Sequence, residues 1–242
     1  MLNPASRVPR IAWILLALAT LGVVVIILFD WNWLRGPISN YLSTKFGRPV
    51  AISGNLRGEF SFAPRLIADN VTLANMSWGT DPLMARAQQI ALRVDVLSLF
   101  GPTVSLPEVT LVRPVLLLER DADGHPNWDF GGAPELPKIG RMNIDAGIVY
   151  FRDPAPGTDI TVDVASDRPT EGGELPVRFK GTGKLRKNDF TIEGHAATVL
   201  ALEDPERPYR LAFQAKAGTT SARFNGTIVP ARIDNVDGTL SL

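Results

Sequence analysis

Side chains able to do chemistry are sparse in this sequence and gather mainly around residues 121–129. Asp121, Asp123, Asn127 and Asp129 place oxygen ligands at roughly alternate positions, as a calcium loop would. The glycine at the sixth position and the terminal glutamate of such a loop are missing. The sequence therefore predicts a turn with solvated acidic side chains at this point, and no metal site.

The other reactive groups also fail to form a recognisable site. The chain has no cysteine, which excludes disulfides, thiolate catalysis and sulfur-ligated zinc, and its two histidines, His125 and His195, are far apart in sequence. There is no Gly-x-Ser-x-Gly elbow, and Gly181–Lys184 lacks the spacing of a phosphate-binding loop. We expect no catalytic, metal or cofactor-binding residues and no enzymatic activity; an anchored hydrolase whose residues meet only on folding is a lesser alternative.

Composition narrows the class of protein further. The 242 residues include 25 Lys plus Arg and 25 Asp plus Glu, so the formal net charge is zero. A nucleic-acid partner is not expected, because phosphate binding needs a basic surplus. Hydrophobic residues make up 45% of the chain, which excludes a disordered protein, and 21 Gly with 19 Pro indicate many turns and few long helices.

The positioning elements begin with a stretch of 19 residues, from Ile11 to Phe29, that contains no charged residue, Asn, Gln or Pro. As a helix it would span roughly 28 Å, close to the hydrocarbon thickness of a bilayer. We therefore predict a single transmembrane anchor over residues 1–30. Its representative side chains are Ile11, Trp13, Leu16, Leu21, Val25 and Phe29.

The flanks of this stretch favour an uncleaved anchor with a cytoplasmic N-terminus. Arg7 and Arg10 precede it, and only Arg35 follows within the next 15 residues. A cleaved signal peptide is the alternative, but a cut after Ala17–Ala19 would leave too short an apolar region upstream. The rest of the chain would then lie outside the inner membrane, which in a bacterium with two membranes is the periplasm.

A short amphipathic helix is predicted over Leu34 to Phe46. Its apolar residues recur every four positions, Pro37 suits its first turn, and Gly47 suits its end. Packing of its apolar stripe on the protein core is the favoured interpretation. The alternative is an interfacial helix that lies on the membrane.

Beyond residue 50 the sequence predicts short strands that alternate apolar and polar residues, and no amphipathic helix after Phe100. The apolar faces of these strands need a cover, so we expect either a curved antiparallel sheet, an open half-pipe whose concave face holds something apolar, or a closed β-sandwich. We divide the β region into residues 31–130 and 131–242, with the boundary at the Gly- and Pro-rich segment 131–137. The clearest alternations are Ile90/Leu92/Val94, Ile160/Val162/Val164, Leu211/Phe213/Ala215 and Ala222/Phe224/Gly226/Ile228.

An ordered series of short motifs resembles the N-terminal region of AsmA family proteins. No single motif is specific, but together they cover nearly the whole chain in order. They are DWNWL at 30–34, GRPV at 47–50, ISGNL at 52–56, PRLIADNVTLAN at 64–75, RPVLLLER at 113–120, NWDF at 127–130, FKGTG at 179–183 and FNGTI at 224–228.

The resemblance implies a protein anchored in the inner membrane of Gram-negative bacteria, with a periplasmic β half-pipe that has an apolar lumen. Members of the family are linked to outer-membrane assembly and resemble bridge-like lipid transfer proteins, so phospholipid is the implied ligand and envelope-bridging proteins are the implied partners. The family has no catalytic motif to carry over. Its members are usually much longer than this chain, which suggests a fragment or a short member.

The leading hypothesis is therefore a protein that binds or conducts phospholipid toward the outer membrane along an apolar groove. A non-lipid scaffold that assists outer-membrane protein assembly is the alternative, and it predicts a filled sandwich core and an exposed edge strand. Alternation alone selects the candidate groove residues, which are Ile90, Leu92, Val94, Leu116, Leu118, Leu211 and Phe213.

Overall fold

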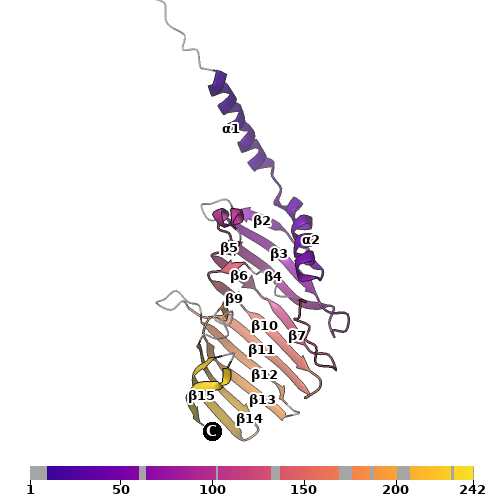
Figure 1. Cartoon of the computed structure of the whole chain (residues 1–242), viewed down its shortest axis with the longest axis vertical. Helices are drawn as coiled ribbons and strands as arrows, with labels where there is room; N and C mark the ends of the chain where they lie inside the picture. Colours follow the sequence, from indigo (N-terminus) through magenta and orange to yellow (C-terminus); the bar gives the residue numbers. More distant parts are fainter. Residues whose placement is uncertain are drawn as a thin grey trace, which may run out of the picture.

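A helix projects from one end of a single large β-sheet (Figure 1). The strands of this sheet are stacked along the longest axis of the molecule, from β2 near the helix to β14 and β15 at the far end (Figure 1). The computed structural model describes residues 10–59, 64–101, 103–131, 137–168, 176–185, 188–200, 208–229 and 232–241.

The projecting helix, α1 (Arg10–Leu28), occupies almost the whole stretch for which a transmembrane anchor is predicted. Its large apolar side chains from Ile11 to Leu21 are each more than half exposed. Within the described part of the chain, no helix is long and apolar enough to cross a membrane. The side chains of residues 22–28, including that of Val25, lie outside the described residues. The anchor therefore stays a proposal.

Two short helical segments connect α1 to the sheet: the 3-10 turn η1 (Trp31–Leu34) and the helix α2 (Arg35–Phe46). The helix begins at Arg35, two residues before Pro37, because η1 runs directly into it. It ends as predicted at Gly47, whose φ of 65° is a left-handed conformation that glycine adopts without steric cost.

The apolar stripe of this helix faces the protein, which confirms that it packs on the core. Leu34 and Ile38 contact a small cluster of buried side chains on the first strands, formed by Ile52, Leu56 and Ala68. Leu56 is only 1% exposed. The helix thus covers one face of the sheet at the end nearest α1.

Among the described residues, fourteen strands belong to one sheet. Two further short strands, β5 (Ser105–Leu106) and β8 (Lys138–Ile139), form a separate pair. A second 3-10 turn, η2 (Val96–Phe100), precedes β5. The strands of the main sheet are β1 (Val50–Ile52), β2 (Leu56–Glu59), β3 (Arg65–Ala74), β4 (Leu83–Arg93), β6 (Glu108–Val112), β7 (Val115–Glu119), β9 (Met142–Asp145), β10 (Gly147–Asp153), β11 (Thr158–Ser166), β12 (Val177–Leu185), β13 (Asn188–Ala196), β14 (Tyr209–Ala217), β15 (Thr220–Val229) and β16 (Arg232–Ser241).

The sheet is open and largely antiparallel, as expected, but it also contains parallel pairs that the sequence did not predict. Consecutive strands from β10 to β16 pair antiparallel, but β10 pairs parallel with β7, and β9 pairs parallel with β6. The first residue of β9, Met142, pairs with Val109 near the start of β6, so the two strands run in the same direction. The closed β-sandwich is wrong, because these strands form one open sheet.

The two parallel pairs are interrupted at the same level. Arg113 and Ala146 both adopt positive φ values, 47° and 51°, which separates β6 from β7 and β9 from β10. The Arg113 N–H donates to the Asp145 carbonyl at 2.7 Å, and the Ile148 N–H donates to the Pro114 carbonyl at 2.8 Å, so pairing resumes at once. The strands before residue 131 therefore join the strands after it in one continuous sheet. The division of the β region into two segments stays a prediction.

Candidate functional site

One face of the sheet is apolar from strand to strand, and we call it the apolar face. Paired residues in neighbouring strands point to the same side of a sheet. The register pairs Val164 with Phe179, Phe179 with Gly194, Gly194 with Phe213, and Phe213 with Phe224. This row crosses five strands without a polar side chain, and the rings of Phe213 and Phe224 lie 5.5 Å apart.

The opposite face is polar and open to solvent. The adjacent row in register runs from Asp163 through Lys180, Glu193 and Gln214 to Arg223, and all five residues are exposed. Cross-strand neighbours of opposite charge stabilise such a row modestly. The alternation noted in the sequence therefore corresponds to two faces of the sheet, one exposed and polar and the other half-buried and apolar.

A cavity of about 730 Å³ runs across six neighbouring strands, β10 to β15. Its lining includes the apolar row described above, from Gly147 to Phe224, and also residues of the adjacent polar row such as Lys180 and Glu193. Because the strands are stacked along the long axis of the molecule, a trough that crosses them follows that axis (Figure 1).

A second cavity, of about 550 Å³, lies between α2 and the middle of the sheet. Its wall is almost entirely apolar and includes Leu42 and Phe46 from α2 and Ile144 from β9. Val199, in the connection between β13 and β14, also lines it. The hydroxyl of Tyr209 donates to the Ala197 carbonyl at 3.0 Å and so fixes this connection beside the cavity.

The two cavities adjoin each other. Gly147, Ile148 and Val164 line both of them. Together they form one apolar trough, which begins under α2 near the helical end of the molecule and extends to β15. The name "apolar trough" is used below for these two cavities and their lining residues.

Three of the seven groove residues selected from the sequence line this trough. Ile90 and Leu116 line the smaller cavity, and Phe213 lines the larger one. Leu92, Leu118 and Leu211 share the apolar face by register but do not line either cavity. Val94 lies beyond the end of β4, where its N–H donates to the Pro64 carbonyl. Whether any of them touches lipid stays a prediction.

Sequence reasoning overlooked several residues that line the trough, in particular Phe179, Ile144 and Val149. The signal was present for Phe179 and Ile144, whose strands alternate with period two. Val149 lies in the continuous apolar run Ile148–Phe151, which does not reveal a face. Gly147 and Gly194 carried no such signal. Their place in the trough follows from strand pairing alone.

The polar groups singled out in the sequence around residue 121 lie in a turn. Asp121, Asp123 and His125 offer ligand atoms within 4.8 Å of one another, and Asp121 Oδ2 lies 3.0 Å from Nδ1 of His125. Desolvation acts to raise the pKa of Asp121, but hydrogen bonds from His125 and Asp123 outweigh it, so this pKa is lower than usual. His195 Nδ1 lies 3.9 Å from Asp167 at an exposed position.

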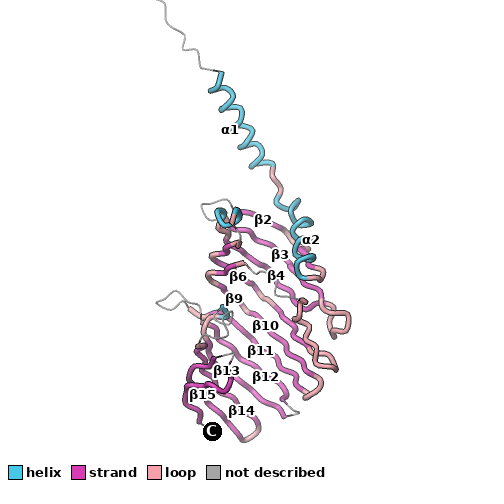
Figure 2. The backbone as a smooth tube through the Cα atoms, viewed as in Figure 1, coloured by secondary structure: helices cyan, strands magenta, loops and turns pink. Residues whose placement is uncertain are grey.

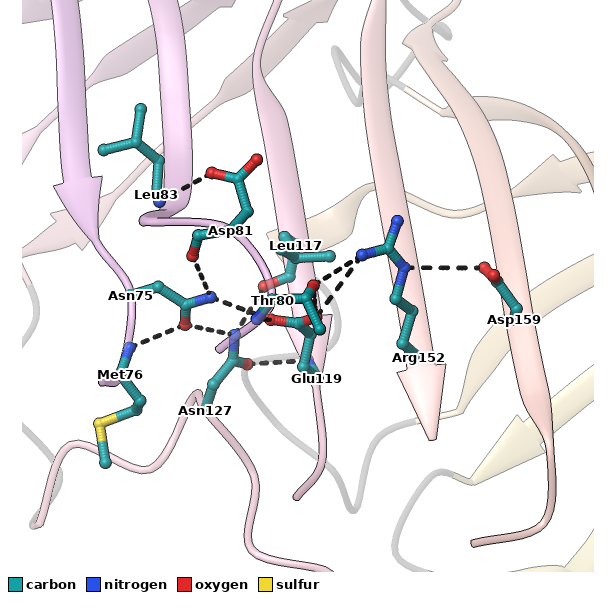
Figure 3. Close-up of polar contacts among 10 residues, drawn as sticks. All are labelled: Asn75, Met76, Thr80, Asp81, Leu83, Leu117, Glu119, Asn127, Arg152 and Asp159. Carbon is teal, nitrogen blue, oxygen red and sulfur yellow. Dashed lines mark hydrogen bonds and ion pairs between the residues drawn. The ribbon is translucent and has the colours of Figure 1, made fainter. Parts of the chain in front are cut away.

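A buried polar cluster next to this turn holds four segments together (Figure 3). Glu119, 2% exposed, accepts hydrogen bonds from the Asn75 side chain at 2.9 Å and from the Thr80 backbone N–H at 3.1 Å. Arg152 of β10 approaches the same carboxylate at 3.7 Å. Asn127, fully buried, links Asn75 to the Leu117 carbonyl. With all of these groups occupied by one another, the cluster fixes the strand ends.

Arg48, two residues after the end of α2, adds a second tie to the same loop. Its guanidinium donates to the backbone carbonyls of Asn127 and Asp129 and lies 4.6 Å from the ring centre of Phe130. Desolvation lowers the pKa of Arg48 from its ordinary value, although the nearby Asp129 carboxylate acts in the opposite direction. These contacts hold α2 over the first strands, where it walls the smaller cavity.

Comparison with known sequences identifies one family that matches this chain. The sequence profile of the AsmA family matches residues 8–148, more than half of the chain. The chain belongs to the AsmA family. The match covers α1, α2 and the strands from β1 to the second residue of β10. It therefore includes the buried polar cluster, apart from Arg152, and most of the smaller cavity.

A curated relative extends the AsmA relationship over nearly the whole chain. AsmA family protein YhjG of Escherichia coli (strain K12) is 25% identical over 263 aligned positions. The alignment covers 92% of this chain but only 38% of the relative. No solved structure matches.

Proposed function

We propose that this AsmA family protein binds phospholipid by its acyl chains in the apolar trough and conducts it from the inner membrane toward the outer membrane. The observation that carries the proposal is the trough itself, an apolar channel that crosses the strands and follows the long axis of the molecule. Membership in a family linked to the bacterial envelope supports the same proposal.

The energetics of such a trough suit transport. Burial of a methylene group contributes about 0.8 kcal/mol, so an acyl chain of 16 carbons gains on the order of 10 kcal/mol. An apolar wall that continues from β4 to β15 offers similar burial at each step. An acyl chain could therefore move along it without a large barrier, while the charged headgroup stays in solvent at the open side.

The proposal places α1 in the inner membrane, with the sheet in the periplasm. Its support is the sequence, which has 19 uncharged residues from Ile11 to Phe29 and two arginines just before them. The exposed apolar side chains of α1 are consistent with this, because a helix that is apolar on all sides needs an apolar surrounding.

Site-specific photo-crosslinking tests the proposal in membranes. A photoreactive amino acid replaces Leu116 or Phe213, one in each cavity, or Lys184 or Lys216, which are exposed on the polar face. We expect phospholipid adducts at Leu116 and Phe213, detected by mass spectrometry. Adducts at Lys184 and Lys216 should be at least tenfold fewer.

Equal labelling on both faces, or no adduct at either trough position, would contradict lipid conduction. The rival function is a scaffold for outer-membrane protein assembly, and it predicts protein adducts without lipid. This rival required a filled sandwich core, whereas the sheet is open and hollow on its apolar face.

A further inference from the structure

An exposed apolar turn stands at the helical end of the sheet. It consists of η2 together with Gly101, Thr103 and Val104. Leu97 is 81% exposed and Phe100 is 87% exposed, although both are large apolar residues. No residue between Val96 and Val104 is charged. Outside α1, most of the large apolar side chains exposed in the described residues belong to this turn: Val96, Leu97, Leu99, Phe100 and Val104.

The turn is preformed, and its polar groups are occupied internally. The Asp95 carboxylate accepts the Leu97 N–H at 3.1 Å, and the Ser98 hydroxyl donates to the Asp95 carbonyl and accepts the Ser105 N–H. The Gly101 N–H donates to the Ser98 carbonyl at 3.0 Å. Such internal pairing lowers the cost of moving a backbone segment out of water.

The position of the turn relates it to α1. Figure 2 shows η2 as the small cyan helix beside β2, at the same end of the molecule's long axis from which α1 projects. The two elements leave that end at different places along its rim. A flat apolar surface that receives α1 would therefore also meet this turn.

Two cations border the turn. Arg93 ends β4, its side chain is 46% exposed, and its Nε lies 3.5 Å from Glu108. Lys138 is exposed, and its N–H donates to the Val104 carbonyl, so it lies directly beside the turn. The base of the turn is of mixed charge, because Glu108 pairs with Arg93 and Asp95 caps the turn. Exposed apolar side chains at a tip suit the acyl region of a bilayer surface, which lies below the phosphates.

We infer that the η2 turn inserts Leu97 and Phe100 into the interface of the membrane in which α1 is anchored. This inference rests on the proposed membrane anchor and adds a second attachment point to it. Two attachments at one end of the molecule would hold the long axis of the sheet away from the membrane plane. They would also keep the α2 end of the apolar trough against the bilayer, where lipid would enter.

The absence of cysteine from the chain allows a direct test with single labels. The full chain is reconstituted into vesicles of phosphatidylethanolamine and phosphatidylglycerol that contain lipids with brominated acyl chains. An environment-sensitive fluorophore is attached in the variants Phe100→Cys, Leu16→Cys in α1, and Lys216→Cys on the far strand β14. We expect the brominated lipids to quench the labels at positions 100 and 16 at least twofold, and to leave the label at position 216 unquenched.

Each other outcome overturns the inference in a distinguishable way. If the label at position 16 is quenched and the label at 100 behaves like that at 216, the anchor stands and the second attachment is wrong. If position 16 is also unquenched, the anchor fails, and both proposals fail with it. If the label at 100 is shielded from aqueous iodide but not quenched by lipid, a protein covers the turn.

A second variant checks that insertion depends on apolar contact. Leu97→Asp, combined with Phe100→Cys, changes a side chain that is 81% exposed, so the fold should be unaffected. Quenching at position 100 should fall to the level at position 216. Unchanged quenching would contradict insertion of the turn.

Discussion

The side-chain oxygen of Asn127 accepts a hydrogen bond from the backbone N–H of Glu119 at 3.0 Å, and both residues are almost completely buried. The Asn127 side chain thereby takes the place of a backbone partner for the last residue of β7. Beyond this residue the chain leaves the strand and enters the turn at Asp121 to His125. Its amide group also donates to Leu117 and Asn75, so one side chain satisfies three partners.

Replacement of this asparagine should destabilise the fold strongly. Asn127→Ala removes three hydrogen bonds from the interior, namely those to the Glu119 N–H, the Leu117 carbonyl and the Asn75 side chain. We expect a loss of about 3 kcal/mol in the free energy of unfolding, measured by urea denaturation of the protein in detergent. Asn225→Ala, on the exposed polar face, is the control and should change stability by less than about 0.5 kcal/mol.

A methyl group at Gly194 should disturb the floor of the trough. A Cβ at this position would lie 2.2 Å from the Ala212 carbonyl oxygen and 2.8 Å from the Phe213 Cα, so the backbone must shift. We expect Gly194→Ala to lower the unfolding free energy by about 1–3 kcal/mol. Gly36→Ala, in α2, meets nothing within 4 Å and should raise stability by up to about 1 kcal/mol. Similar values for the two variants would refute close strand packing at Gly194.

The buried phenol of Tyr209 should make the fold sensitive to alkaline pH. Burial raises the pKa of Tyr209 above its usual value, because the neutral form is favoured and donates to the Ala197 carbonyl. Its stabilising effect is complete below the pKa of the unfolded chain, about 10, and is lost as pH rises through the higher folded value.

Comparison with Tyr209→Phe isolates this effect. The variant should lose about 1 kcal/mol at pH 7, since one hydrogen bond is removed. From pH 10 upward its deficit should shrink, because only the parent protein has a phenol to ionise. The measurement is urea denaturation of both proteins at pH 7 and above pH 10, together with the tyrosinate absorbance of the folded protein. A constant deficit at all pH values would argue against a perturbed Tyr209.

A charge in the shared wall of the two cavities should block lipid binding. Val164 lines both cavities, so Val164→Lys places an ammonium group in the trough, and a charge is costly to hold in an apolar surrounding. We expect at least a tenfold fall in co-purified phospholipid, measured by native mass spectrometry. Thr182→Lys adds the same charge on the exposed polar face and should retain the lipid. Equal retention in both variants would exclude the trough as the lipid site.

Local features of the fold were predictable because they depend on neighbouring residues. Gly47 ends α2, as the sequence indicated. The alternation of Ile160, Val162 and Val164 marks a strand with one apolar face. Each of these patterns fits within one element, so no distant partner is needed to interpret it.

The sequence by itself therefore determined the strand-rich class, the apolar N-terminal segment and the two-sided character of the strands. Only the tertiary structure decided that β7 and β10 pair parallel, that Glu119 is buried, and that Val164, Phe179 and Phe213 line one trough. The reason is that alternation assigns a side chain to one of two faces. Pairing between distant strands decides which neighbours share that face and whether it is covered or left hollow.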